Sequence, residues 1–140
     1  MPNDNKALIH RLYDEVINGG DVGLLDELVA ADFVEHEEFP GLPGGREGMK
    51  QFFAMMRTAF PDFRMAVDDV IAEGDKVVAR ATMSGTHKGE FMGMEPTGKQ
   101  FRVSAIDVIR FASGKAAEHW GVTDTAGMME QLGAIPAAGS

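Results

Sequence analysis

FRVSAIDVIRF, residues 101–111, is the stretch of sequence that decides the fold. Apolar side chains fill every second position along it, and only Asp107 interrupts them. Such alternation is typical of a half-buried β-strand. The turn residues Ala112-Ser113-Gly114 follow at once, and residues 115–123 form the expected partner strand. The sequence therefore predicts a β-hairpin that carries a carboxylate on its apolar face.

Outward from this hairpin, the period of the apolar pattern changes. Residues 63–72 and 76–85 favour two more strands joined by a turn, and residues 32–36 favour a short one. Spacings of three and four residues predict helices over 6–18, 21–29, 46–60 and 124–132. Helices first and a meander of strands after them are typical of an α+β fold.

We therefore expect a single α+β domain over residues 1–140, in which residues 134–140 form a loose tail. A strongly curved antiparallel sheet wrapped around the helices would leave a concave interior. Such interiors are where small ligands bind.

Composition narrows the classes of function. The formal net charge of -9 disfavours binding to nucleic acid or to anionic membrane surfaces. The chain has no cysteine, so disulfides, thiolate metal sites and a cysteine nucleophile are excluded. No apolar run approaches the roughly 20 residues of a membrane span, and the first residues lack a signal-peptide pattern. We expect a cytoplasmic protein that acts on a small molecule.

Asp107 is the most informative residue because it shares the apolar face of its strand. A buried carboxylate is costly unless it is paired, protonated or hydrated, and acids with perturbed pKa values gather at functional sites. The alternative is a structural aspartate that is satisfied by the backbone or by a neighbouring cation.

The turn of the hairpin decides which residue faces Asp107. A bulged turn with a left-handed Gly114 places His119 opposite Asp107, whereas a plain two-residue turn places Trp120 there and sends His119 outward. We expect the bulged turn, because Ser113-Gly114-Lys115 suits it. The resulting pair of acid and histidine is able to transfer protons, and a purely structural hydrogen bond is the alternative.

Further candidates lie near the predicted interior. His36 ends the first strand near the mouth of the concavity, and Tyr13 lies on the buried stripe of the first helix. We predict that these two residues join Asp107 and His119 in catalysis, with the tyrosine hydroxyl at the pocket edge. The histidines and the aspartate match no compact metal motif, so neither a metal nor another cofactor is expected. The substrate-binding candidates are His87, Trp120, Phe60 and Met56.

Several motifs resemble the SnoaL-like polyketide cyclase family, and together they cover nearly the whole chain in order. They are Phe60-Pro61-Asp62, GTHKGEFMG at 85–93, Pro96-Thr97-Gly98, the stretch from Gly114 through Glu118-His119-Trp120 to Asp124, and Gln131-Leu132-Gly133. The resemblance implies a cone-shaped α+β barrel and a homodimer or homotetramer. It also implies a small hydrophobic or polyketide-like substrate and cofactor-free acid/base chemistry, such as aldol ring closure.

Two positions depart from the pattern of this family. The founding cyclases carry a catalytic aspartate where this chain has Gly121, and a histidine where it has Asp107. The histidine that matches His119 is kept.

A second and more distant resemblance is to the ketosteroid isomerases, which share the cone fold. Residues 106–111 resemble the strand that carries their oxyanion-hole aspartate, which an apolar site keeps neutral. Tyr13 matches their oxyanion-hole tyrosine, and His36 falls at or next to the position of their general-base aspartate.

Together, these patterns favour an enzyme of the lyase or isomerase class that acts on an enolisable carbonyl compound. His36 or His119 would remove the proton next to the carbonyl. Tyr13 and a protonated Asp107 would donate hydrogen bonds to the enolate.

Two alternatives stay open. The first is hydrolysis of an epoxide, for which related folds use an arginine in the interior, but the arginines of the strands have outward parity: Arg80, Arg102 and Arg110. The second is a small-ligand-binding protein without activity, because Gly121 cannot transfer a proton.

Overall fold

The computed structural model describes residues 2–37, 39 and 41–134. Five strands form one sheet in the order β1-β5-β4-β3-β2. They are β1 (Val29–Glu35), β2 (Arg64–Glu73), β3 (Lys76–Thr86), β4 (Gln100–Ala112) and β5 (Lys115–Thr123). With helices packed against this sheet in a single domain, the predicted α+β fold is confirmed. Of the predicted tail, residues 135–140 lie outside the described residues.

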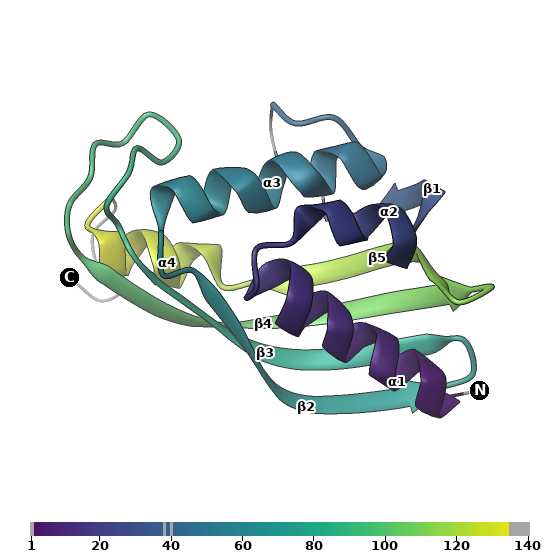
Figure 1. Cartoon of the computed structure of the whole chain (residues 1–140). Helices are drawn as coiled ribbons and strands as arrows, with labels where there is room; N and C mark the ends of the chain where they lie inside the picture. The colour runs from purple at the N-terminus through teal and green to yellow at the C-terminus, as the bar shows by residue number, and fades with distance from the viewer. Residues whose placement is uncertain (1, 38, 40, 135–140) are drawn as a thin grey trace.

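Helices cover one side of the sheet, as Figure 1 shows for α1, α2 and α3. The first of them continues directly into a π-helix, so that its last turn is widened. No described helix combines the length and the apolar character that crossing a bilayer requires. The helical elements are α1 (Pro2–Arg11), the π-helix η1 (Leu12–Ile17), the 3-10 turn η2 (Val22–Leu24), α2 (Leu25–Leu28), α3 (Gly45–Ala59) and α4 (Thr125–Leu132).

The sheet is mostly antiparallel and open. Strands β2, β3, β4 and β5 pair antiparallel in chain order, whereas β1 runs parallel to β5. Strands β1 and β2 are therefore opposite edges, and the sheet curves between them (Figure 1). The concave side faces the helices, and the side chains on that side form the predicted interior.

Alternation along β4 separates the inner face of the sheet from the outer one. The odd-numbered residues 101–111 are buried, whereas the even-numbered ones are exposed or half-buried. The inner side chains join one apolar core with those of β3 and of the helices. Asp107 is 8% exposed and lies on this inner face, as the alternation predicts.

The turn between β4 and β5 is not the predicted bulged turn. Ala112 pairs with Lys115, so the turn contains two residues, Ser113 and Gly114. Their φ values of 53° and 78° are both left-handed, as in the type I′ turn that suits a two-residue hairpin. The prediction that His119 lies directly opposite Asp107 is therefore wrong.

A β-bulge further along β5 changes which side chains of this strand face the interior. Ala116 pairs with Phe111 and Glu118 with Arg110, so that Ala117 is an extra residue on β5. One extra residue inverts the alternation of every side chain after it. His119 thereby returns to the inner face of the sheet.

Candidate active site

Tyr13 and Asp107 meet in the interior between the helices and the sheet. Tyr13 projects from η1, is 2% exposed, and donates a hydrogen bond from its hydroxyl to Oδ2 of Asp107 on β4. Burial and then the charge of Asp107 raise the pKa of Tyr13 above its usual range. The hydroxyl therefore keeps its proton at neutral pH and acts as a donor that orients Asp107.

His119 lies between two carboxylates. Its Nε2 atom is 2.8 Å from Oδ1 of Asp107, and its Nδ1 atom hydrogen-bonds to Oε2 of Glu35 at the end of β1. Burial by itself lowers the pKa of His119, but the hydrogen bonds and charges of Asp107 and Glu35 outweigh it and raise the pKa to about 10. The imidazole is therefore cationic at neutral pH, and both of its N–H groups donate.

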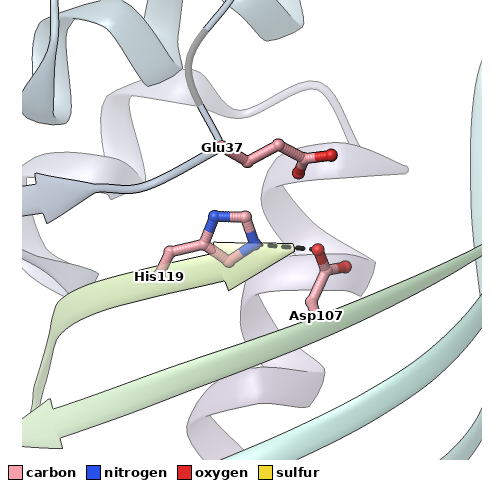
Figure 2. Close-up of side chains that lie close together, drawn as sticks. All are labelled: Glu37, Asp107 and His119. Carbon is pink, nitrogen blue, oxygen red and sulfur yellow. Dashed lines mark hydrogen bonds and ion pairs between the residues drawn. The ribbon is translucent and has the colours of Figure 1, made fainter. Parts of the chain in front are cut away.

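Glu37 completes the cluster from the segment that follows β1. Figure 2 shows Glu37, His119 and Asp107 converging from three separate segments of the chain. The hydroxyl of Thr123 donates to Oε2 of Glu37 over 3.2 Å. Burial and then the charge of Asp107 raise the pKa of Glu37, although the charge of His119 and the bond from Thr123 oppose this shift. A carboxyl of this kind exchanges its proton closer to neutral pH than an ordinary glutamate.

Gly121 provides the space in which this carboxylate lies. It is the residue directly opposite Asp107 in the β4–β5 pair. A Cβ atom at position 121 would lie 2.5 Å from Oε1 of Glu37, and 2.8 Å from both Oδ1 of Asp107 and Cε1 of His119. Real Cβ atoms do not approach other atoms this closely, so a larger residue at this position displaces part of the cluster.

His36 and Trp120 lie together on the outer face of the sheet. Their rings stack with centroids 4.9 Å apart, and Nε2 of His36 is 2.6 Å from Oε2 of Glu118. Both rings line a groove of about 290 Å³ on this face. The structure thus does not bring His36 to Asp107 and His119, although the sequence pattern predicts that the three act together.

Phe60, Met56 and His87 are packed inside the core. Phe60 and His87 are fully buried, and Met56 is 2% exposed. The ring of Phe60 packs 5.0 Å from that of Phe101. Phe101 precedes Asp107 by six residues on β4, which is about 20 Å along a strand. These predicted substrate-binding residues therefore stand apart from the cluster of titratable side chains.

Glu35 and Glu37 belong to the site, although His36, which lies between them in the sequence, is the residue that its type alone would suggest. The buried Phe33 marks the inner face of β1. Side chains two and four residues further along a strand share that face, whereas His36 has the opposite parity. Parity along β1 is thus a signal for Glu35, and only its extension two residues past the end of the strand includes Glu37.

The arginines of the strands face outward, as their parity predicts. Arg80 lies 4.0 Å from Asp68, and Nε of Arg110 lies 2.9 Å from Glu118, both on the outer side of the sheet. Arg102 is exposed. An interior arginine of the kind expected for epoxide hydrolysis is therefore not supplied by these three strand positions.

Three residues of the cluster also satisfy a geometric condition for holding a cation. Glu37, Asp107 and His119 each offer a ligand atom, and these atoms lie within 4.8 Å of one another. One imidazole with two carboxylates is a donor set that divalent cations accept. The direct bond between His119 and Asp107 already satisfies those two groups.

Known proteins share both the sequence and the fold of this chain. The sequence model of the SnoaL-like polyketide cyclases matches residues 7–132. Aklanonic acid methyl ester cyclase AcmA from Streptomyces galilaeus is 30% identical over 110 residues, which cover 74% of this chain and 76% of that protein. Nogalonic acid methyl ester cyclase from Streptomyces nogalater is 27% identical over 118 residues, covering 83% and 88%.

A solved structure extends the comparison to three dimensions. The crystal structure of wild-type IdmH from Streptomyces antibioticus superposes with a TM-score of 0.79 at 37% identity. It covers 91% of this chain, and 97% of the IdmH chain is matched. The family match over residues 7–132 contains all the residues of the cluster, from Tyr13 to His119. The chain belongs to the SnoaL-like polyketide cyclase family.

Proposed function

We propose that this protein is an enzyme that closes a carbon ring in a polyketide-derived carbonyl compound by an intramolecular aldol reaction, without a cofactor. The observation that carries the proposal is the cluster of Tyr13, Asp107, His119 and Glu37 on the inner side of the sheet, in which the first two are buried and the last two half-buried. An aldol closure needs a proton to be removed next to a carbonyl and a proton to be returned to the new alkoxide. The cluster contains carboxylates, which can take up and return a proton, and a cationic imidazole, which can stabilise the negative charge that develops.

His119 is the cationic member of the cluster in this proposal, and it contributes its positive charge rather than a proton transfer. Because its pKa is raised to about 10, His119 carries a proton on each ring nitrogen at neutral pH. Asp107, oriented by Tyr13, then holds the imidazolium in position through Nε2. A fixed positive charge beside the substrate would stabilise the enolate and the alkoxide, and pre-aimed groups of this kind contribute about 3 kcal/mol each.

The class of substrate follows from the relatives. Two of them are named as cyclases of the methyl esters of aklanonic acid and nogalonic acid. We extend this class, a polyketide acid methyl ester with enolisable carbonyls, to the present chain. The partly exposed side of the cluster at His119, whose side chain is 13% exposed, is where such a substrate would meet it.

We also propose that two copies of the chain associate through the outer face of the sheet. This face carries apolar side chains that are 47% to 74% exposed: Val34, Ile106, Val122 and Ile71. Exposed apolar groups gathered on one face mark interaction surfaces. The same face carries both signs of charge, in the Arg110–Glu118 and Arg80–Asp68 pairs, so a second copy is an electrostatically acceptable partner.

Solvent deuterium exchange tests the proposed reaction. Aklanonic and nogalonic acid methyl esters are incubated in deuterated buffer with wild-type protein or with Asp107→Ala, and the products are followed by NMR. We expect deuterium at the carbon next to a carbonyl, together with ring closure, and a collapse of both in the variant. Exchange no faster than in buffer for either ester would count against the proposal and favour simple ligand binding.

A further inference from the structure

The carboxylate of Glu37 is the least neutralised of the cluster. Asp107 accepts hydrogen bonds from Tyr13 and His119, one on each oxygen. Glu35 is ion-paired with His119 through Oε2, which also accepts the backbone N–H of Glu37. Among the described residues, the side chain of Glu37 has a single hydrogen-bond partner, the hydroxyl of Thr123. One of its oxygens therefore remains available beside Asp107 and His119.

The geometry points to Glu37 as the catalytic base, lodged in the space that Gly121 leaves open. This inference rests on the proposed ring closure and names the residue that takes the proton from carbon. A side chain at position 121 would start 2.5 Å from Oε1 of Glu37, so the two positions cannot both fill this place. The chain thus supplies its acid/base group from the segment after β1 and has no side chain at the facing position on β5.

The other members of the cluster are unsuited to be the base. His119 is cationic at neutral pH and has no free lone pair. Tyr13 holds its proton, because burial and the charge of Asp107 raise its pKa. Both oxygens of Asp107 accept hydrogen bonds from neighbours. Glu35 is held in an ion pair with the cationic His119. Glu37 is then left, and burial raises its pKa, which makes its carboxylate a stronger base than an exposed glutamate.

The step balances within the site. The carboxylate of Glu37 removes a proton from the carbon next to a carbonyl, and the electron pair of that C–H bond forms the enolate. The enolate carbon attacks a second carbonyl of the same molecule, which forms the new C–C bond and leaves an alkoxide. The carboxyl of Glu37 returns its proton to that alkoxide. Substrate and product have the same composition, and the enzyme is restored without a co-reactant.

Moving the carboxylate from position 37 to position 121 tests this inference. The variants are Glu37→Gln, Gly121→Asp and the double variant Glu37→Ala/Gly121→Asp, with the exposed Glu95→Gln as matched control. We expect Glu37→Gln to slow deuterium exchange into nogalonic acid methyl ester by roughly 100-fold. The control should match the wild type, and the double variant should recover part of the lost rate. Wild-type exchange in Glu37→Gln overturns the inference, as does activity that chelator abolishes and a divalent cation restores, since Glu37 would then be a metal ligand.

A second measurement does not depend on turnover. The side-chain carboxyl of Glu37 is titrated by carbon NMR, assigned by comparison with Glu37→Gln. We expect its pKa to lie above the ordinary glutamate value of 4.5, and an ordinary value would overturn the role of Glu37. If the wild type leaves the esters unchanged while Glu37 titrates as expected, the proposed ring closure fails, whereas the assignment of Glu37 as the basic group is supported.

Discussion

The Nε2 atom of His119 lies 2.8 Å from Oδ1 of Asp107, although the two residues are not opposite each other in the sheet. His119 pairs with Ile109, so it meets Asp107, two positions before Ile109 on β4, diagonally. Diagonal neighbours on one face of an antiparallel pair are within reach of long side chains. The diagonal contact leaves the place directly opposite Asp107 to Gly121, and Glu37 uses that place.

Two replacements of Asp107 should show what its charge and its hydrogen-bonding shape each contribute to the rate. We expect Asp107→Ala to lower the rate of deuterium exchange by roughly 100-fold, and Asp107→Asn to lower it less, because the amide oxygen still accepts a hydrogen bond from Tyr13. The pKa of His119 should fall in both variants, since the bond and charge of Asp107 help to raise it. Kinetics and imidazole NMR measure the two effects. Equal activity of the wild type and both variants would show that Asp107 takes no part in the reaction.

Stability should decrease as the pH rises above neutrality. The folded pKa of His119, about 10, lies above its ordinary value of 6.5, so the folded state holds this proton more tightly than the unfolded state does. The stabilisation is complete below pH 6.5 and is lost as the pH rises through about 10. Between these values, the free energy of unfolding should fall by about 1.4 kcal/mol per pH unit from this group. Urea unfolding across this range measures the slope, which should flatten in His119→Gln; a slope unchanged by that variant would contradict the shift.

The sequence pattern predicts the elements from α3 onward closely. The helix expected at 46–60 is α3 (Gly45–Ala59), and the strand expected at 115–123 has the bounds of β5 (Lys115–Thr123). Apolar alternation and clear turn residues specify these elements locally. The strand expected at 32–36 instead spans Val29–Glu35. It is a parallel edge strand, and its first residues lack alternation because pairing with β5 rather than local preference defines it.

The candidate site is predicted only in part, for a related reason. Alternation places Asp107 on the inner face, and the stripe of the first helix places Tyr13 near it. The bulge at Ala117 has no turn residue to mark it, so the final position of His119 depends on pairing that local sequence does not specify. Glu37 lies beyond the end of β1, where its placement depends on the empty position at Gly121.

The hydroxyl of Tyr13 should stabilise the fold through Asp107. Tyr13→Phe leaves one oxygen of a buried carboxylate without its donor, which we expect to cost about 1–3 kcal/mol in the free energy of unfolding. Urea denaturation of Tyr13→Phe, Asp107→Ala and the double variant forms a thermodynamic cycle. A coupling free energy above about 0.5 kcal/mol is expected for groups in direct contact. Additive effects would show that the two side chains do not interact in solution.

His36 and His119 should respond differently to truncation. His36 stacks on Trp120 on the outer face, whereas His119 bonds to Asp107 on the inner face. We expect His36→Ala to keep the rate of deuterium exchange within about 3-fold of the wild type, and His119→Ala to lower it by roughly 100-fold. The two proteins are compared with the same ester at saturation. A loss in His36→Ala as large as that in His119→Ala would restore His36 to the catalytic group.

Association through the outer face should depend on Val122. This side chain is 74% exposed and lies beside its register partner Ile106, which is 48% exposed, in the middle of the apolar outer face. We expect Val122→Glu to convert a wild-type dimer or tetramer into a smaller species, because the new carboxylates would be desolvated in the contact. Light scattering after gel filtration measures the mass of each protein. The exposed Asp75→Ala, in the β2–β3 turn, is the control and should leave the mass unchanged. A wild type that is monomeric at high concentration, or a Val122→Glu variant with the wild-type mass, would show that this face does not join the copies.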